Sequence, residues 1–205
     1  MTDLNLFDAH SYLGRFTRYQ EGYFCEKADL LVEMNHFGIA EALVIDTLSR
    51  ELDPRAGNPR VVETCAGEER LHPAWALAPP VQSLPYPLDE LPVQMAGAGV
   101  RAVWLFPGHL HFTLADLHPI LEVLEQERVP LFVDPSPLLI GGTRDLTDWG
   151  AMVQLCRDHP DLPVVTTEAR MYWPTRQSLS ALAAAPNRHI ELSPFWLYQG
   201  IEFVC

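Results

Sequence analysis

A histidine just after the first apolar run is the clearest candidate for chemistry in this chain. His10 stands in the stretch Asp8-Ala9-His10-Ser11-Tyr12-Leu13-Gly14, directly after the apolar run 4–7. Alternate residues on a strand point the same way, so a His-x-His pair would aim two imidazoles at one metal ion. Tyr12 holds the second place here. The chain therefore carries half of a metal-binding motif.

A second pair of histidines has the spacing that the first stretch lacks. His109 and His111 follow an apolar run that ends at Phe106. Pro107 and Gly108 stand between them and that run and predict a loop, in which strand alternation does not set the side-chain direction. The two histidines are therefore predicted to be solvated loop residues rather than metal ligands.

An arginine near aromatic residues is a candidate for holding a substrate. Arg170 lies two residues after Glu168 and two residues before Tyr172. A guanidinium can bind a carboxylate through two parallel hydrogen bonds, and it stacks on aromatic faces. Arg170 is thus either a clamp for a substrate carboxylate or the partner of Glu168 in a structural loop.

Strand-like and helix-like stretches alternate along the chain and would have to position these residues. The strand-like runs are 4–7, 42–46, 73–78, 100–106, 131–134, 164–167 and 189–192. The helical patterns are 28–37, which stops at Gly38, 116–128, 146–159 and 175–185. Runs that are almost wholly apolar suit a parallel sheet covered by helices. Strict alternation of the two patterns implies an α/β fold.

Seven strand-like runs predict a barrel without its last unit. A (β/α)₈ TIM barrel closes with eight parallel strands. We expect a single barrel domain over residues 1–205, with the last βα unit missing from this chain. An open sheet would leave two long parallel edges, which favour association. The chain alone is therefore expected to be poorly soluble or to form a homo-oligomer.

The composition and the net charge limit the kinds of protein and of binding partner that are expected. A length of 205 residues with 48% hydrophobic residues allows a sizeable core, and the formal net charge of −13 argues against nucleic acid and anionic membranes as partners. The four cysteines form no Cys-x-x-Cys pair and indicate reduced thiols. No apolar run is long enough to span a bilayer. We expect a soluble, cytoplasmic protein with a small-molecule substrate.

Short segments follow one another over nearly the whole chain in an informative order. They are Phe7–His10, 31–39, Ala42–Ile45, Gly57–Glu63, His72–Pro79, Gly99–Val103, 117–121, 129–133 and 159–165. In order and spacing they resemble the amidohydrolase-related family of metal-dependent TIM-barrel hydrolases and decarboxylases. The resemblance implies the same barrel fold.

The resemblance also implies where a metal would be held. Members typically bind a divalent ion with two histidines after the first strand, one after the fifth, one after the sixth and an aspartate after the eighth. His10 keeps the first position, and Tyr12 replaces the second. The fifth and sixth positions fall on Asp134 and Glu168, and the eighth lies beyond Cys205. The implied site is degenerate, with His10, Asp134 and Glu168 as its ligands or catalytic groups.

One imidazole and two carboxylates would make a harder site than a histidine-rich one. Such a site favours Mn²⁺, Mg²⁺ or Fe²⁺ over Zn²⁺, and the ion would acidify a bound water and polarise a carbonyl. Without an ion, His10 would donate a hydrogen bond to Asp134 or Glu168 in a buried polar network. Tyr12 and Arg170 are the expected substrate-binding residues.

Two functions follow, and the sequence leaves both open. The resemblance implies a metal-dependent hydrolase or decarboxylase that acts on a small carboxylate or amide, by C–N hydrolysis or by decarboxylation. The alternative is a non-catalytic barrel that has lost its metal ligands and serves in ligand binding or assembly. Fold alone does not decide between them.

Overall fold

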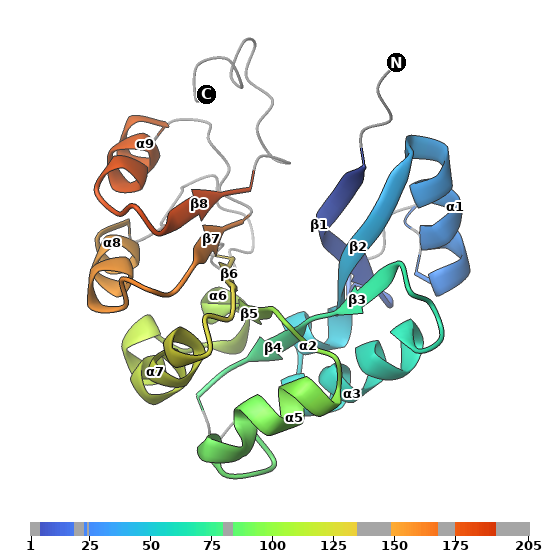
Figure 1. The fold of residues 1–205 in the computed structure, drawn as a ribbon, viewed down its shortest axis with the longest axis horizontal. Coiled ribbons are helices and arrows are strands. Elements are labelled where there is room, and N and C mark those ends of the chain that lie inside the picture. Colours follow the sequence, from blue (N-terminus) through green and yellow to red (C-terminus); the bar gives the residue numbers. More distant parts are fainter. Residues whose placement is uncertain are drawn as a thin grey trace. The chain divides into compact units, whose positions relative to one another are not determined.

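The computed structural model describes residues 5–18, 23, 25–79, 84–134, 149–167 and 175–191, the first four residues of the last range by backbone only. By its contacts the chain divides into two compact units, residues 1–103 and 104–205. The expectation of a single domain over residues 1–205 stays a prediction. Within each unit the strands and helices alternate as the sequence predicts (Figure 1).

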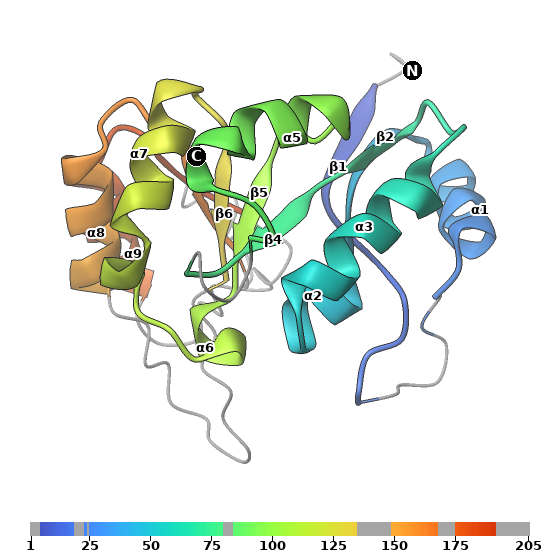
Figure 2. The ribbon, with the colours of Figure 1, turned by 90° about the horizontal axis from the view of Figure 1, so that it is seen from below.

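Unit 1 is built on a three-stranded parallel sheet. Its strands are β1 (Leu6–Leu13), β2 (Ile39–Asp46) and β3 (Leu71–Pro73), in that spatial order. The helices α1 (Lys27–Phe37), α2 (Thr47–Glu51) and α3 (Pro54–Cys65) lie against β2 (Figures 1 and 2). Residues 42–46 of β2 are all buried, as expected of a parallel strand covered on both faces. The unit continues through β4 (Trp75–Leu77), the 3₁₀ turn η1 (Leu88–Glu90) and α5 (Leu91–Gly97).

Local sequence explains where the helices of unit 1 begin and end. Helix α1 ends at Gly38, as predicted, in the left-handed conformation that glycine adopts without strain. The carboxylate of Asp46 accepts a hydrogen bond from the backbone N–H of Leu48 and starts α2. Asp53 caps α3 in the same way, and Pro54 occupies the first helical position.

Unit 2 repeats the strand and helix pattern with shorter strands. Its strands are β5 (Val103–Leu105), β6 (Leu131–Val133), β7 (Val164–Thr166) and β8 (Arg188–Ile190), in that order, with β6, β7 and β8 paired in parallel. The helices α7 (His118–Gln126), α8 (Trp149–Asp158) and α9 (Thr175–Ala183) cover one face of these strands (Figures 1 and 2). Two short elements, α6 (Pro107–Leu110) and η2 (Leu114–Leu117), connect β5 to α7.

Three predicted boundaries are wrong, each for a local reason. The first strand extends to Leu13 instead of ending at residue 7, because it pairs with β2 along its whole length. The run 73–78 is two strands, because the chain changes hydrogen-bonding partner there: Ala74 N–H donates to Val44 and Trp75 N–H to Ala102. The predicted loop at residues 107–110 is the helix α6.

Candidate active site

The two residues of the half-motif meet within strand β1. The Nε2 atom of His10 lies 3.1 Å from the phenol oxygen of Tyr12, and both side chains are half-buried. Strand alternation predicts that the two side chains share a face, and the structure confirms it. His10 itself lies inside the strand rather than beyond its end, which corrects the sequence-based placement.

A bulge shapes the strand at His10. Asp8 pairs with Ala42 and Ser11 with Val44, so three steps on β1 oppose two on β2. The Asp8 carboxylate stabilises this turn of the backbone. It accepts hydrogen bonds from the His10 backbone N–H at 2.9 Å and from the Ser11 hydroxyl at 2.6 Å. Asp8 therefore fixes the backbone at His10 through these hydrogen bonds.

An arginine from helix α2 lies over the aromatic side chains next to His10. The guanidinium carbon of Arg50 is 5.6 Å from the ring centre of Tyr12 and 5.6 Å from that of Phe16. The Tyr12 and Phe16 rings contact each other edge to face at 5.2 Å. Both arginine distances fall within the range of a cation–π interaction. No motif in the sequence singles out Arg50.

The buried Asp46 holds the helix that carries Arg50. Burial raises the pKa of Asp46, against the opposing effects of the Leu48 N–H and of Arg60, whose Nε is 3.4 Å from the carboxylate. The same carboxylate caps α2. Asp46 thus has a structural role at the end of β2, although its position at a strand end also suits a functional residue.

In unit 2 a fully buried aspartate follows strand β6. Asp134 is 0% exposed, and its backbone N–H donates to the carbonyl of Leu105 on the neighbouring strand β5. The Nε2 atom of His109 lies 3.9 Å from its Oδ2 atom, and the His109 side chain is 11% exposed. The two residues therefore come together at the carboxyl ends of adjacent strands.

The prediction that His109 and His111 are both solvated is wrong for His109. Pro107 starts the short helix α6, which turns His109 toward Asp134. Only His111 is exposed, with a left-handed φ of 55° at the end of that helix. Pro107, which predicts a loop in the sequence, is instead the first residue of a helix.

Aromatic side chains surround this second pair. Trp104 stacks on Phe106 and on Phe132, with ring centres 5.6 and 4.9 Å apart. Phe106 meets the His109 ring edge to face. All three aromatic residues are buried. The His109–Asp134 pair therefore lies beside a buried aromatic cluster.

The described donors do not complete a metal site. The part of the chain that the structure describes contains no group of three or more His, Cys, Asp or Glu side chains placed to hold an ion. A catalytic zinc site uses at least three protein ligands, and His10–Tyr12 and His109–Asp134 supply two donors each. Glu168 and Arg170, the other predicted site residues, lie outside the described residues.

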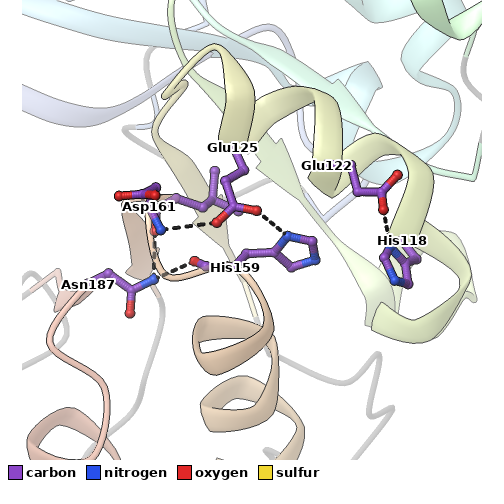
Figure 3. Close-up of polar contacts among 7 residues, drawn as sticks. His118, Glu122, Glu125, His159, Asp161 and Asn187 are labelled. Carbon is purple, nitrogen blue, oxygen red and sulfur yellow. Dashed lines mark hydrogen bonds and ion pairs between the residues drawn. The ribbon is translucent and has the colours of Figure 1, made fainter.

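A further polar cluster lies at the opposite ends of the unit 2 strands (Figure 3). The Glu125 carboxylate accepts hydrogen bonds from His159 Nδ1 at 2.8 Å and from the Asp161 backbone N–H at 3.0 Å. The side-chain amide of Asn187 donates to the carbonyls of His159 and Leu162. Glu125 lies near the end of α7, before β6, and the other residues come just before β7 and β8. In barrel proteins, residues at the amino ends of the strands contribute to stability rather than to catalysis.

No helix in the described ranges is both long and apolar enough to cross a membrane. Neither a family model nor a curated protein matches the sequence.

Solved structures with similar folds include named enzymes and TIM-barrel proteins. A probable 2-pyrone-4,6-dicarboxylic acid hydrolase from Acinetobacter baumannii, with citric acid bound, aligns with a TM-score of 0.63 at 15% identity, over 94% of this chain and 71% of that one. A 4-oxalomesaconate hydratase from Rhodopseudomonas palustris aligns with a TM-score of 0.63 at 16% identity, over 97% and 77% of the two chains.

A third similar structure is amidohydrolase 2 from Bifidobacterium longum subsp. infantis. It aligns with a TM-score of 0.59 at 14% identity, over 90% of this chain and 72% of that one. The predicted fold class is therefore confirmed: the chain has a parallel α/β fold of the TIM-barrel type, similar to that of these structures.

Proposed function

We propose that this chain is an amidohydrolase-type enzyme that hydrolyses or decarboxylates a small substrate bearing a carboxylate or an amide. The observation that carries the proposal is the His109–Asp134 pair, buried at the carboxyl ends of neighbouring strands. Barrel enzymes keep their reacting groups at those ends. Burying a carboxylate is costly, and a buried carboxylate beside an imidazole is a frequent feature of active sites.

The pair suits acid–base chemistry. In hydrolysis, His109 would accept a proton from water while the water oxygen bonds to the substrate carbonyl carbon. The imidazolium would then return that proton to the leaving nitrogen or oxygen as its bond to carbon breaks. Asp134 would orient His109 and stabilise its protonated form. Their separation of 3.9 Å is longer than a hydrogen bond, and such contacts often shorten when a substrate binds.

The predicted metal ligands remain part of this proposal, but no reaction step is assigned to a metal ion. His10, Asp134 and Glu168 stay the predicted ligands of a divalent ion, which would activate water if bound. Tyr12 and Arg170 stay the predicted substrate-binding residues. The proposed proton transfers are assigned to His109 and Asp134, because their side chains lie close together at the carboxyl ends of neighbouring strands.

Activity on a panel of small substrates tests the proposal. The panel contains carboxylated lactones, cyclic amides, N-acyl amino acids and aromatic carboxylates, assayed with the purified chain. Carboxylated lactones are included because a similar fold belongs to a probable pyrone dicarboxylic acid hydrolase. We expect His109→Gln and Asp134→Asn each to lose about a hundredfold or more in turnover.

The matched control is His111→Gln, since His111 is exposed on the same short segment. It should keep wild-type turnover. If both His109→Gln and Asp134→Asn keep wild-type turnover, the acid–base role of His109 and the orienting role of Asp134 are wrong. A folded wild-type chain without activity on the whole panel would favour the non-catalytic alternative.

A further inference from the structure

We infer that Thr167 is a positioning residue for Asp134. It follows strand β7, is fully buried, and bonds the peptide group that joins Val133 to Asp134. The inference deepens the proposed function and rests on it, because Asp134 is assigned there to orient His109. Thr167 would act through the backbone of Asp134, and no chemical step is assigned to Thr167 itself.

The peptide group between Val133 and Asp134 is held at both ends. Its N–H donates to the carbonyl of Leu105 on β5 at 2.9 Å. Its carbonyl oxygen accepts two hydrogen bonds from Thr167, one from the backbone N–H at 2.9 Å and one from the hydroxyl at 3.3 Å. A carbonyl oxygen has two lone pairs, so it can accept both. A rotation of this peptide plane would swing the Asp134 side chain, and it would disturb hydrogen bonds to both neighbouring strands.

The register of the strands places Asp134 and Thr167 side by side. Val133 pairs with Thr166, so the next residue of each strand, Asp134 or Thr167, lies at the carboxyl end of β6 or β7 on a shared face. Side chains alternate along a strand, so that of Thr166 points to the opposite face. Its hydroxyl accepts a hydrogen bond there from Nε of the buried Arg188 at 3.1 Å. Two adjacent buried threonines therefore hold different parts of unit 2.

The hydroxyl is the part of the Thr167 contact that a substitution can remove. The bond from the backbone N–H belongs to the ladder of a parallel sheet, and any residue except proline can make it. The hydroxyl bond is longer than a typical O–H···O bond and needs threonine or serine at this position. Valine has the shape of threonine and would put a methyl group against the carbonyl oxygen of Val133. The peptide group, and with it Asp134, is therefore expected to shift in Thr167→Val.

Turnover of the full chain on the substrate panel is the first test. Thr167→Val should lower kcat about tenfold, because small displacements of reacting groups are costly, and it should leave KM near the wild-type value. Thr167→Ser keeps the hydroxyl and should restore kcat. A residue that only stabilises the fold would give neither the separation of kcat from KM nor the rescue by serine.

NMR gives a second readout that needs no turnover. The ring-nitrogen signals of His109, assigned by their absence in His109→Gln and measured at one fixed pH, report the surroundings of the imidazole, which include the Asp134 carboxylate. They should move in Thr167→Val and return to the wild-type positions in Thr167→Ser.

The matched control is Thr166→Val, the same change one residue earlier and on the opposite face. It removes the acceptor of the Arg188 Nε bond, so the melting temperature should fall. The kcat value and the His109 signals should stay as in the wild type. Circular dichroism checks that each variant folds. If Thr167→Val does not fold, Thr167→Ala, which also lacks the hydroxyl, decides the result.

Unchanged kcat or unchanged His109 signals in a folded Thr167→Val would overturn the inference, and so would equal changes in Thr166→Val. The two readouts separate this inference from the proposed function. If the wild type has no turnover but Thr167→Val moves the His109 signals, only the proposed function is contradicted. If turnover requires His109 and Asp134 but is the same in Thr167→Val, only this inference is contradicted.

Discussion

Asn58 is a single buried side chain that joins three elements of unit 1. Its Oδ1 atom accepts hydrogen bonds from the Ser49 hydroxyl at 3.0 Å and from the backbone N–H of Ala76 at 2.9 Å. Its Nδ2 atom donates to the carbonyl of Ala76 at 2.9 Å. One amide on α3 thereby satisfies both backbone groups of a residue in β4 and fixes the position of α2.

Replacing Asn58 by alanine should destabilise the protein strongly. The change leaves the buried N–H and C=O of Ala76 without these partners, at about 1–3 kcal/mol for each group. We expect a loss of about 2–5 kcal/mol in the free energy of unfolding, measured by urea denaturation. Asn35→Ala, at an exposed site that accepts one hydrogen bond from Arg70, should cost under about 1 kcal/mol. Equal losses in the two variants would refute this interpretation.

The candidate site shows which residue positions a sequence can predict. Strand alternation places His10 and Tyr12 on one face, and their side chains do meet. An apolar run that ends in an aspartate predicts Asp134 at a strand end, where it lies. Arg50 could not be predicted, because its approach to Tyr12 depends on the register that pairs Tyr12 with Ile45 and brings the start of α2 beside the end of β1.

At the scale of elements, α2 and α3 approach each other closely at one glycine. A Cβ atom added to Gly57 would collide with the backbone nitrogen and the hydroxyl of Ser49. Helix α3 can lie against α2 only because Gly57 has no side chain. The contact also brings Ser49 within hydrogen-bonding distance of Asn58.

Gly57→Ala should therefore destabilise the protein even though alanine favours helices. Separating α2 from α3 costs about 1–3 kcal/mol, as for other overpacked sites, against less than about 1 kcal/mol gained in helix propensity. The matched variant is Gly97→Ala in α5, where an added Cβ meets no atom within 4 Å. It should be neutral or slightly stabilising. Thermal unfolding monitored by circular dichroism measures both, and a stabilised Gly57→Ala would contradict the argument.

The Glu125 cluster should make unit 2 sensitive to acid. Burial alone would raise the pKa of Glu125, but the hydrogen bonds from His159 and from the Asp161 N–H, with the charge of His159, together lower it. A carboxyl with a lowered pKa in the folded state stabilises the protein above its unfolded pKa, near 4.5. That stabilisation is lost as the pH falls through the folded pKa.

Glu125→Gln should therefore lower the melting temperature at pH 6, and its difference from the wild type should shrink as the pH falls from about 4.5 toward 3. Glu122→Gln is the control, since Glu122 is exposed beside His118 at 3.7 Å. It should change the melting temperature little at any pH. If the difference in melting temperature between the wild type and Glu125→Gln grows as the pH falls, the predicted direction of the pH dependence is wrong.

Element types were predictable where the local pattern was long and regular. The apolar stripe of 116–128 predicts α7, and the buried residues Ile120, Leu121 and Leu124 confirm it. Short elements were not predictable. Helix α6 has only four residues, begins with the Pro-Gly pair and has no apolar repeat. Its direction depends on contacts with the next strand, which a local pattern does not contain.

At the scale of the whole molecule, the acidic charge affects which ligands can bind. The formal net charge of −13 repels small anions. Binding of an anionic ligand would therefore depend on positive charge concentrated locally, as arginine side chains can provide.

The metal content of the whole protein distinguishes the metal-binding site from the metal-free polar network, the two alternatives that the sequence leaves open for His10. If His10, Asp134 and Glu168 hold a divalent ion, the purified chain should contain about one equivalent of metal by elemental analysis. His10→Ala should lose most of it, because two carboxylates would remain and Tyr12 is a poor ligand at neutral pH with a reference pKa of about 10. His36→Ala, at an exposed position on α1, should keep the wild-type metal content.

The same ion should stabilise the folded chain by mass action. Mn²⁺ or Zn²⁺ at about a hundred times its dissociation constant adds roughly 2.7 kcal/mol to the free energy of unfolding, because the ion binds the folded state and not the unfolded one. A shift of that size is readily measured as a rise in melting temperature, reversed by a chelator and absent in His10→Ala. A wild-type chain with no metal and no such shift would make His10 a member of a metal-free polar network. Acid–base chemistry would then depend on His109 and Asp134, which lie 3.9 Å apart in unit 2.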